Sequence, residues 1–490
     1  MRFNRLYKDN NYLTPTTYTQ TLSEYTENLK YEDIPPEVVE RAKMIMLQVI
    51  GVALGAKDTS IAKKVCRMAE EANGGEGGSN IVWGTGEKMA AVNAALALGT
   101  LSDALDWEDC SWTGHPSAGV IPCAWVAAEE KHKSGKDLIT AIVAGYEVYQ
   151  RIACAVQPSN ERWKTKGWGL TSWQIFACII PIVKLYGLDA RKINQAIGMG
   201  CECSTLPTAY HATTMSDFYH YEHGYRARDG FLIAKSVEKS IHNQRDALDC
   251  PRCYTAVICG DAAKSGSNNN MDNINESDES WLTRDLGSRY LIMETLLKHW
   301  PANMWVQTSV EIVSNMANEY KFRPEDIEEI VIDPPIINRM WAPDEGFTSV
   351  THAQFSAPYV IATMLYNPVP GAYWYSAEMM KDPKIIALAK RVKAGPSKPD
   401  SPMTGFEQFR NGSYPMKTIT IKLKDGRELV GKMDCHPGHP ANMMSREEFI
   451  ERFRIQASPV LQGEKLEKAI EMLCNIEQVE DIASVSDMLS

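Results

Sequence analysis

The spacing of apolar side chains predicts that helices dominate the first half of the chain. Between residues 36 and 56, apolar side chains recur at intervals of three and four residues, the period of one helix face. Pro35 and Pro36 stand at the beginning of this run, a frequent arrangement at helix starts. Similar patterns predict further helices at 89–105, 136–154, 173–186, 189–199 and 229–241.

The pattern changes to a period of two further along the chain. Residues 327–335 are typical of a buried strand, and residues 417–433 predict a hairpin around the Asp-Gly turn at 425–426. Helical spacing returns at 445–456 and 465–473. We therefore expect a mainly α fold: a helical domain over residues 1–290, a smaller α+β domain over 291–432, and C-terminal helices over 433–490 that complete the helical domain. The polar segment 265–280 predicts a solvated loop or insertion.

Composition and charge narrow the class of protein. The 490 residues are 44% hydrophobic and 23% charged, which is typical of a globular chain with more than one domain. The net charge of −11 and the scattered basic residues argue against a nucleic-acid partner. No apolar stretch reaches the roughly 20 residues of a membrane span. The absence of a secretory pattern and the irregular spacing of the 12 cysteines predict reduced thiols and a cytoplasmic location.

The candidate chemistry lies in the segment DALDWEDCSWTGHPSAGVIPCAW, residues 103–125. Asp106 and His115 flank a loop of turn-forming residues, so both can face one cavity as base and acid. A helix is expected to begin near Pro116 with Ser117 as its cap, and its N-terminus would favour an anion. In isolation, an Asp–His pair in a loop is more often a structural capping arrangement.

Four stretches together resemble the MmgE/PrpD family, whose members dehydrate, decarboxylate or epimerise small carboxylic acids. They are YEDIPPEVVERAKMIMLQVIGVALGA (31–56), the segment 103–125, AQFSAPYVIATML (353–365) and HPGHPANMMSREEFIERF (436–453). The resemblance implies an all-helical domain built from both chain ends and an inserted α+β lid. It also implies a homodimer, a small-molecule carboxylate as substrate, and no metal, nucleotide or other cofactor.

The resemblance also assigns roles to single residues. Asp106 and His115 match the acidic and histidine positions of the family motif, and Lys298 matches a lysine that holds a substrate carboxylate when the lid closes. His223 matches a common family histidine, and Tyr359 matches a pocket-facing aromatic residue. A place in the protein core is an equal alternative for Tyr359.

Two departures from the family pattern weaken the match. Gly169 stands where a second histidine is usual, and Tyr219 takes the place of a family lysine, so one acid–base group and one cation are missing. Tyr219 is still expected to contact substrate. Four basic residues nearby are possible substitutes: His220, His223, Arg226 and Arg228. Glu108 and Asp109 are expected to lie behind the reacting groups or to face solvent.

Aromatic residues are unusually frequent around these motifs. Trp107, Trp112 and Trp168, with Cys110, are expected to line the substrate site, and Trp163 and Trp173 lie nearby. Five tryptophans with fewer cations suggest a substrate bulkier or more aromatic than a citrate-like acid. Simple core packing is the alternative for each of them.

Metal-like spacings elsewhere in the chain are weak. Cys250 and Cys253 have the spacing of half a zinc site, but no second pair follows. His436 and His439 resemble a ligand pair, yet they lie in a family motif that links the lid to the C-terminal helices. We therefore expect no metal ligands.

These features favour a cofactor-independent lyase. Asp106 would handle a carbon-bound proton, His115 would serve as general acid or base, and Lys298 would bind a carboxylate. Dehydration is the first expectation, with epimerisation or isomerisation and decarboxylation as alternatives. A rival from another class is a non-catalytic paralogue that acts as a binding or partner subunit, which Gly169 and Tyr219 favour.

Overall fold

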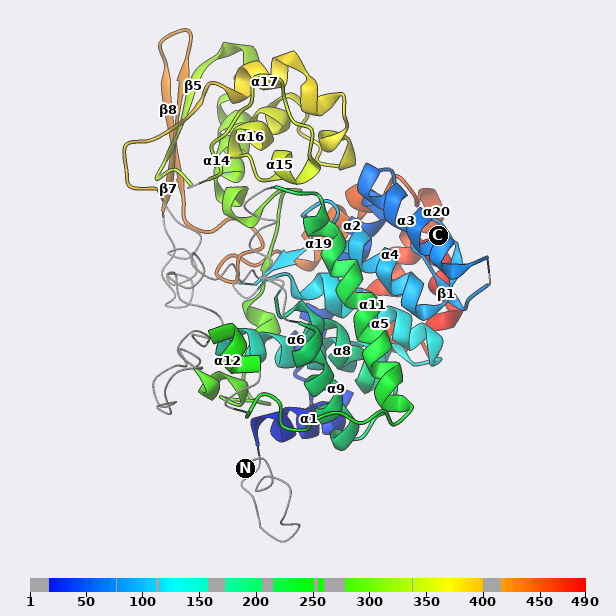
Figure 1. Cartoon of the computed structure of the whole chain (residues 1–490). Helices are drawn as coiled ribbons and strands as arrows, with labels where there is room; N and C mark the ends of the chain where they lie inside the picture. Colours follow the sequence, from blue (N-terminus) through cyan, green and yellow to red (C-terminus); the bar gives the residue numbers. More distant parts are fainter. Residues whose placement is uncertain are drawn as a thin grey trace.

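A computed structural model describes residues 17–75, 77–111, 114–156, 172–204, 215–250, 254–259, 278–336, 338–399 and 416–490. The fold is mainly α, as predicted. A large helical body occupies most of the molecule, and a smaller α+β unit, called the lid below, lies at one end of it (Figure 1).

The helical body is built from both ends of the chain. Its helices are α1 (Tyr18–Asn28), α2 (Pro36–Ala56), α3 (Ser60–Asn73), α4 (Ala91–Asp103), α5 (Pro116–Glu130), α6 (Gly135–Val156), α8 (Gln174–Leu185), α9 (Ala190–Cys203), α11 (Phe218–Glu238), α12 (Tyr254–Cys259), α19 (Arg446–Ala457) and α20 (Gly463–Cys474). Helices α19 and α20 pack against α2, so the C-terminal segment returns to the N-terminal one. Two short ladders complete the body: β1 (Asn80–Ile81) with β2 (Lys88–Met89), and β3 (Asp109–Cys110) with β4 (Leu296–Leu297).

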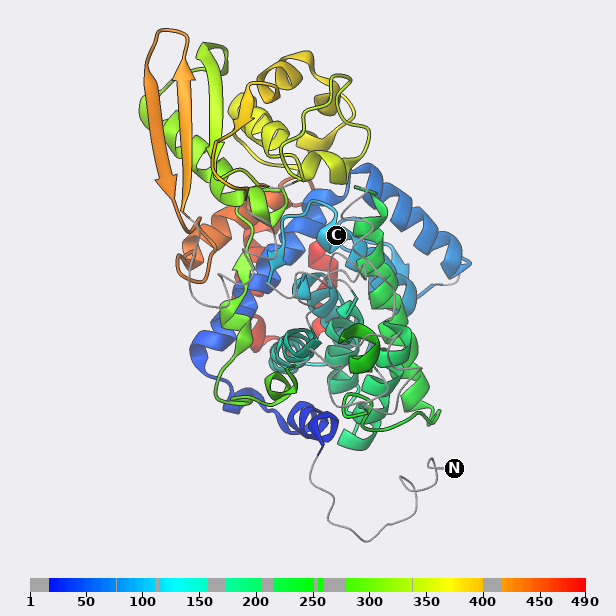
Figure 2. The same cartoon turned by 60° about the vertical axis from the view of Figure 1, so that its left-hand side comes forward.

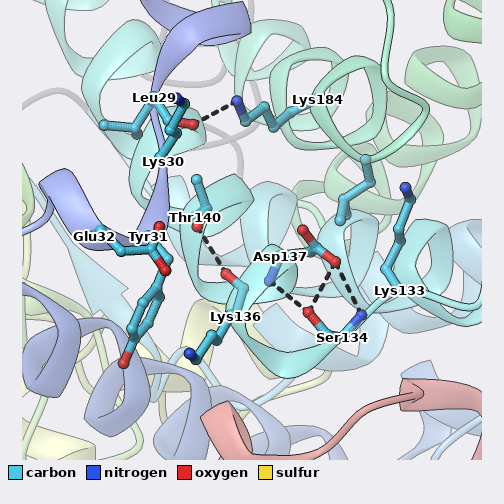
Figure 3. A pocket seen from close by; sticks show the side chains of 11 residues that line it. Leu29, Lys30, Tyr31, Glu32, Lys133, Ser134, Lys136, Asp137, Thr140 and Lys184 are labelled. Carbon is cyan, nitrogen blue, oxygen red and sulfur yellow. Dashed lines mark hydrogen bonds between the residues drawn. The ribbon is translucent and has the colours of Figure 1, made fainter.

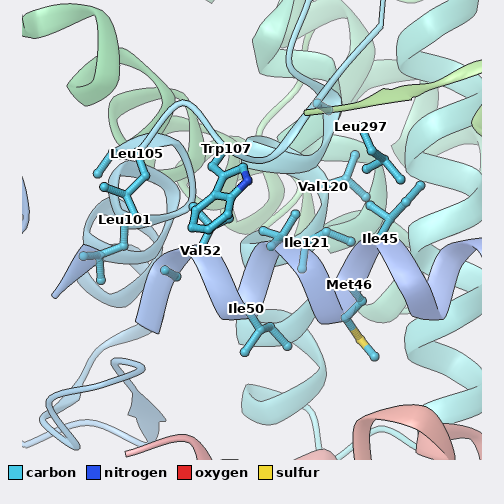
Figure 4. Close-up of a cluster of buried hydrophobic side chains, with 14 of the residues drawn as sticks. Ile45, Met46, Ile50, Val52, Leu101, Leu105, Trp107, Val120, Ile121 and Leu297 are labelled. Atoms are coloured by element: carbon cyan, nitrogen blue, oxygen red, sulfur yellow. The ribbon is translucent and has the colours of Figure 1, made fainter. Parts of the chain in front are cut away.

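Helices α2, α5 and α8 form the centre of the body. They are apolar around most of their circumference and almost wholly buried, as expected of helices surrounded by others. Figure 4 shows side chains of α2, among them Ile45, Ile50 and Val52, in one buried cluster with Ile121 and Trp107. The segments that carry the candidate functional residues lie against this core.

The lid carries a four-stranded sheet of order β6-β5-β7-β8. Its strands are β5 (Ile327–Asp333), β6 (Val392–Ala394), β7 (Lys417–Leu423) and β8 (Glu428–Met433), and its helices are α14 (Gln307–Tyr320), α15 (Val350–Gln354), α16 (Ala357–Tyr366) and α17 (Pro383–Ala389). The hairpin prediction is confirmed, because β7 and β8 pair antiparallel across the turn. Ile419, Ile421 and Leu423 are buried, and the helices lie on one side of the sheet (Figure 2).

Residues just after 290 pack on the body. Strand β4 pairs with β3, and the turn at Leu291–Glu294 packs against α2 and α6. The boundaries at 290 and 432 stay predictions. None of the helices in the described part of the chain combines the length and apolar character that a membrane crossing needs.

Helix α11 begins well before the residue at which the sequence pattern predicted a helix. Its first three turns carry Tyr219, His220 and His223, and these side chains are buried although most are polar. A hydrophobic pattern cannot reveal a helix whose buried face is built from polar groups. The missed turns are the ones that approach Asp106 and His115.

Candidate active site

The link between α4 and α5 carries most of the acidic groups of the site. Asp103 is the last residue of α4, and the backbone N–H of Asp106 donates to the Asp103 carbonyl at 2.8 Å. Asp106 has a φ of 50°, in the left-handed region that Asp tolerates better than most residues. This tight turn brings Asp106 and Glu108 back beside Asp103, and all three carboxylates are buried.

The short β3–β4 ladder places Lys298 opposite these carboxylates. Asp109 pairs with Leu297, and the backbone N–H of Lys298 donates to the Glu108 carbonyl at 3.1 Å. The Gln48 side-chain amide of α2 donates to the carbonyl of Lys298 at 3.2 Å, and Arg452 of α19 donates to the same oxygen at 2.6 Å. Helices from both chain ends therefore fix the lysine backbone.

Asp106, His115 and Lys298, predicted as the reacting residues, lie together in one buried cluster. The Lys298 ammonium contacts Asp106 Oδ1 and Glu108 Oε1, and its Nζ lies 3.3 Å from His115 Nδ1. His115 Nδ1 also lies 2.6 Å from Glu108 Oε1 and 3.3 Å from Asp103 Oδ1. Three carboxylates, one ammonium and one imidazole thus share a site closed to water.

Helix α11 supplies the opposite wall of the cluster. The Tyr219 hydroxyl is hydrogen-bonded to His115 Nε2 at 2.7 Å. His220 Nδ1 donates to Asp103 Oδ2 at 2.5 Å, and His223 Nε2 lies 3.4 Å from Asp103 Oδ1. Asp103 therefore stands between three histidines, and Tyr219 lies against the ring nitrogen of His115 that Glu108 does not contact.

The protonation states follow from these contacts. Burial and the Lys298 charge act to lower the pKa of His115, but its hydrogen bonds with Asp103 and Glu108 prevail and raise the pKa to about 9. Burial raises the pKa of Glu108 to about 7, against the opposing effect of Lys298. His115 is therefore an imidazolium at neutral pH, with one N–H directed to Glu108 and the other to Tyr219.

The neighbouring ionisable groups also have shifted pKa values. Burial opposes ionisation of Asp103, yet the three histidines hold its pKa well below the usual range. The pKa of His220 is raised because its bond to Asp103 outweighs burial, whereas burial lowers the pKa of His223 to about 3. The pKa of Lys298 is raised because Asp106 and Glu108 outweigh its burial. The site thus keeps charged donors and acceptors in a low-dielectric interior.

Sequence reasoning missed one contributor. Asp103 was not proposed as part of the centre, although it lies only three residues before Asp106, whereas His220 was among the suggested substitutes for the missing basic groups. Glu108 and Asp109 were expected to lie behind the reacting groups or to face solvent; Glu108 is buried and contacts Lys298 and His115 directly, which excludes the solvent-facing alternative. Asp109 is also buried, against the solvent-facing alternative.

Asp109 supplies a carboxyl group at the start of α5, and burial raises its pKa. Its Oδ1 accepts from the backbone N–H of Ser117 at 3.1 Å and from the Ser117 hydroxyl at 2.6 Å, and Tyr146 donates to its Oδ2 at 2.5 Å. The expected cap at Ser117 is wrong, because the N-cap residue is His115. A side chain of the protein therefore fills the place where a bound anion was expected, and it braces the helix that carries His115.

Three predicted substrate contacts are buried against other parts of the protein, and their contact with a substrate stays a prediction. Trp107 is buried in the core, where its indole N–H donates to the His299 carbonyl at 3.0 Å (Figure 4). Tyr359 lies inside the lid, and its hydroxyl donates to the Trp374 carbonyl. Cys110 is buried beside Met304, and burial raises the pKa of its thiol. Four residues named from the sequence, Trp112, Trp163, Trp168 and Gly169, lie outside the described residues, as does Cys253.

Side-chain atoms of the types that bind metal ions lie close together in the buried cluster. Ligand atoms of Asp103, Asp106, Glu108 and His115 all lie within 4.8 Å of one another, and so do those of Asp103, His115 and His223. The Lys298 ammonium, however, contacts three members of the first group, so a side-chain cation already balances these carboxylates. A divalent ion would meet this charge and the imidazolium at close range, and the donor set does not favour one.

A hollow of about 330 Å³ on the surface of the body is a separate feature (Figure 3). It lies between the loop after α1, the start of α6 and the end of α8. Lys184 donates there to the carbonyls of Glu27 and Leu29, at 2.8 Å and 2.7 Å, and Asp137 accepts from Ser134. These polar groups hold the ends of helices in place, and none of them belongs to the buried cluster.

Comparisons with known proteins match this chain along most of its length. The model of the MmgE/PrpD N-terminal domain matches residues 20–266, and that of the MmgE/PrpD C-terminal domain matches residues 300–478. A cis-aconitate decarboxylase of Homo sapiens is 23% identical over 483 residues, which cover 96% of this chain and 94% of the human protein. Cis-aconitate decarboxylases of Aspergillus terreus and Mus musculus are each 22% identical, over 96% of this chain and over 96% and 93% of their own lengths. With both domain models matched along most of its length, this chain belongs to the MmgE/PrpD family.

Proposed function

We propose that this protein is a lyase that acts on a small carboxylic acid by moving a proton at the carbon next to a carboxylate. The observation that carries the proposal is the setting of His115. Its imidazole is buried, held by Glu108 on one nitrogen and hydrogen-bonded to Tyr219 on the other. A proton donor held in a water-excluded site is the group that such a reaction needs.

Asp106 supplies the complementary base. Its Oδ1 contacts Lys298, while its buried Oδ2 has no hydrogen-bond partner among the described residues. An unpartnered carboxylate oxygen is available to accept a proton from carbon. The pair therefore offers one acceptor and one donor in a single site, with Lys298 stabilising the negative charge that develops on a substrate carboxylate.

Decarboxylation is the first candidate reaction, because relatives that cover nearly the whole chain are named cis-aconitate decarboxylases. In that reaction the bond between carbon and the leaving carboxylate breaks and carbon dioxide departs. The bond pair stays on carbon and is delocalised toward a neighbouring group. The proton of His115 then forms the new C–H bond, so one acid loses carbon dioxide and gains one proton.

Dehydration is the second candidate and uses both groups. Asp106 removes a proton from carbon, the hydroxyl leaves from the adjacent carbon, and His115 donates the proton that turns it into water. Epimerisation needs only removal and return of a proton, which Asp106 and His115 also permit. Decarboxylation, dehydration and epimerisation at this site therefore give different products, by which they can be distinguished.

The rival hypothesis of a non-catalytic subunit is less consistent with the buried charges. Removing several ionised groups from water costs several kcal/mol each, and their mutual attraction offsets this cost only with good geometry. An apolar core of equal volume serves a fold as well or better. Keeping Asp106, Glu108, His115 and Lys298 together in the interior is therefore best explained by chemistry.

The test is product analysis in heavy water with citrate and cis-aconitate as first substrates. A decarboxylase product lacks carbon dioxide and carries solvent deuterium at the protonated carbon. A dehydratase product differs by water, and an epimerised product is an isomer that carries deuterium. The His115→Gln protein is the control for contaminating activity. If no small carboxylic acid reacts or binds across a panel of mono-, di- and tricarboxylates, the proposal is wrong.

A further inference from the structure

We propose that Arg452 of α19 is a positioning residue that fixes the Lys298 ammonium against Asp106 and Glu108. The inference rests on the proposed function and deepens it, because it names a residue outside the buried cluster on which the geometry of the reacting groups depends. Arg452 follows Lys298 by 154 residues in the chain. It acts through the backbone of the segments that carry the charges and does not touch the substrate itself.

The Arg452 guanidinium binds two consecutive carbonyl groups. One terminal nitrogen donates to the Lys298 carbonyl at 2.6 Å, and the other donates to the His299 carbonyl at 2.8 Å. The N–H groups of a guanidinium project from one rigid plane, so two acceptors bound to it are held in a fixed relation. The backbone directly after Lys298 is therefore fixed in orientation as well as in position.

The same guanidinium also contacts the segment that carries the carboxylates. Its centre lies 5.4 Å from the centroid of the Trp107 ring, within the range of a cation–π interaction. Trp107 lies between Asp106 and Glu108 in the chain. Its indole N–H donates at 3.0 Å to the His299 carbonyl, the acceptor that Arg452 also binds. One side chain thus joins the segment of the lysine to the segment of its two acidic partners.

The same two segments are joined at a second point by Gln48 of α2. The Gln48 amide donates to the Trp107 carbonyl at 2.7 Å and to the Lys298 carbonyl at 3.2 Å. The backbone N–H of Lys298 donates to the Glu108 carbonyl at 3.1 Å. Hydrogen bonds at several points therefore set the separation of the two segments, and Arg452 provides the charged ones.

The charge of Arg452 is not needed to fill space in the core. The residue is 7% exposed, and burial lowers its pKa to about 9, so the guanidinium is still charged at neutral pH. Among the described residues it forms no ion pair, and its Nε has no hydrogen-bond partner there. A buried cation without a carboxylate costs stability, and an apolar side chain of similar length would occupy the same volume. The carbonyl groups that Arg452 holds explain why a cation is kept here.

Arg454, two residues further along α19, is a natural comparison. Its side chain is 38% exposed and pairs with Glu467 at 2.9 Å and with Glu451 at 3.2 Å. Exposed ion pairs of this kind contribute little to stability. Arg454 therefore offers the same residue type on the same helix, without a contact to the segment that carries Lys298.

The position of the Lys298 ammonium affects each reacting group. It contacts Asp106 and Glu108, and its Nζ lies 3.3 Å from His115 Nδ1. Without Arg452, two buried carbonyl groups lose charged donors, so the segment shifts and the ammonium moves away from the imidazole. A misplacement of about 1 Å can lower a rate about 10²-fold. Because the Lys298 charge acts to lower the pKa of His115, that pKa should rise when the ammonium moves away.

The test compares Arg452→Met and Arg452→Lys with Arg454→Met. Turnover at saturating substrate should fall about 10- to 100-fold in Arg452→Met. Arg452→Lys should give an intermediate value, because one ammonium cannot hold both carbonyls in the same fixed geometry, and Arg454→Met should match the wild type. The His115 titration is followed by NMR in protein labelled with carbon-13 histidine, and its signal is assigned by its loss in His115→Gln. The His115 pKa should be higher in Arg452→Met than in the wild type.

A purely structural role predicts a different result. The melting temperature would then fall in Arg452→Met, while turnover per folded molecule and the His115 titration would stay unchanged, and the inference would be wrong. If Arg452→Met does not fold, the same two measurements on Arg452→Lys decide. The titration needs no substrate. A raised His115 pKa in Arg452→Met, when the wild type converts no acid, would uphold the positioning of Lys298 and refute the proposed function. An unchanged titration, when the wild type does convert an acid, would refute the inference alone.

Discussion

The charged side chains at the centre of this molecule are held by one another instead of by water. Glu108 Oε1 contacts both Lys298 and His115, so a single carboxylate oxygen links the ammonium to the imidazolium. Removing one member of such a set leaves the others buried and unpaired, which typically costs about 3–5 kcal/mol. Substitutions here therefore change stability as well as activity, and conservative variants give the clearest results.

His115→Gln should lower turnover by about 10²–10⁴, the usual contribution of a general acid or base. Gln keeps hydrogen-bonding capacity but cannot donate the proton. His132→Gln is the matched control, because His132 is 71% exposed by its side chain and pairs with Asp481 at the surface. Near-normal turnover in His115→Gln, with the fold intact by circular dichroism, would contradict the assigned role.

The pH dependence of turnover should report the His115 proton. Because the raised pKa of about 9 keeps the imidazolium below that pH, the rate should be maintained at neutral pH and fall as pH rises through about 9. Glu108→Gln removes a carboxylate that raises this pKa, so the falling limb should move to lower pH. If the alkaline fall in turnover stays at the same pH in Glu108→Gln, another group controls it.

At the scale of elements, the site depends on the contact between α4 and α11. A Cβ on Gly224 would overlap the backbone carbonyl oxygen of Leu96, so these helices approach as closely as they do only because this residue is glycine. Two of the histidines that surround Asp103 lie within one turn of Gly224 on α11. The spacing between the two helices therefore sets the geometry of the histidines around Asp103.

Gly224→Ala should push α11 away from α4 and destabilise the protein by about 1–3 kcal/mol, the usual cost of overpacking. Because His220 would separate from Asp103, turnover should fall as well. Gly77→Ala serves as the control, since an added Cβ there meets no atom within 4 Å. Thermal melts and turnover assays of both variants test this, and equal behaviour of the two variants would contradict it.

The docking of the lid depends on Asp217. Its carboxylate accepts from the Ser349 hydroxyl, from the Thr351 backbone N–H at 3.1 Å and from the Thr351 hydroxyl at 3.2 Å. Asp217→Ala should remove about 1–3 kcal/mol of stabilisation and speed hydrogen exchange at 349–354. Asp229→Ala, at a surface pair with Arg228, is the control. If hydrogen exchange at 349–354 is unchanged in Asp217→Ala, these hydrogen bonds do not hold the lid on the body.

At the scale of the whole molecule, segments from both ends of the chain meet around one lysine. Gln48 from α2 and Arg452 from α19 hold the Lys298 backbone, and β4 pairs with the strand that begins directly after Glu108. The homodimer and the cytoplasmic location stay predictions, and light scattering would test the first as a mass of about twice 54.8 kDa.

The sequence alone was sufficient where a signal is local. Helical periodicity located α2, α6 and α20, and the Asp-Gly turn located the β7–β8 hairpin, because each pattern reflects which side of one element meets the core. The family motifs identified Asp106, His115 and Lys298, which the structure places together. Trp107 and Tyr359 show the limit, since an aromatic residue in a motif can as well be buried in the core.

The tertiary structure decided how the charges are partnered. Asp103 was not recognised from the sequence, and the partners of Asp103, Glu108 and His220 become apparent only where α4, β3 and α11 converge. Residues far apart in sequence determine each other's pKa and partners, whereas the hydrophobic pattern records only burial along one element.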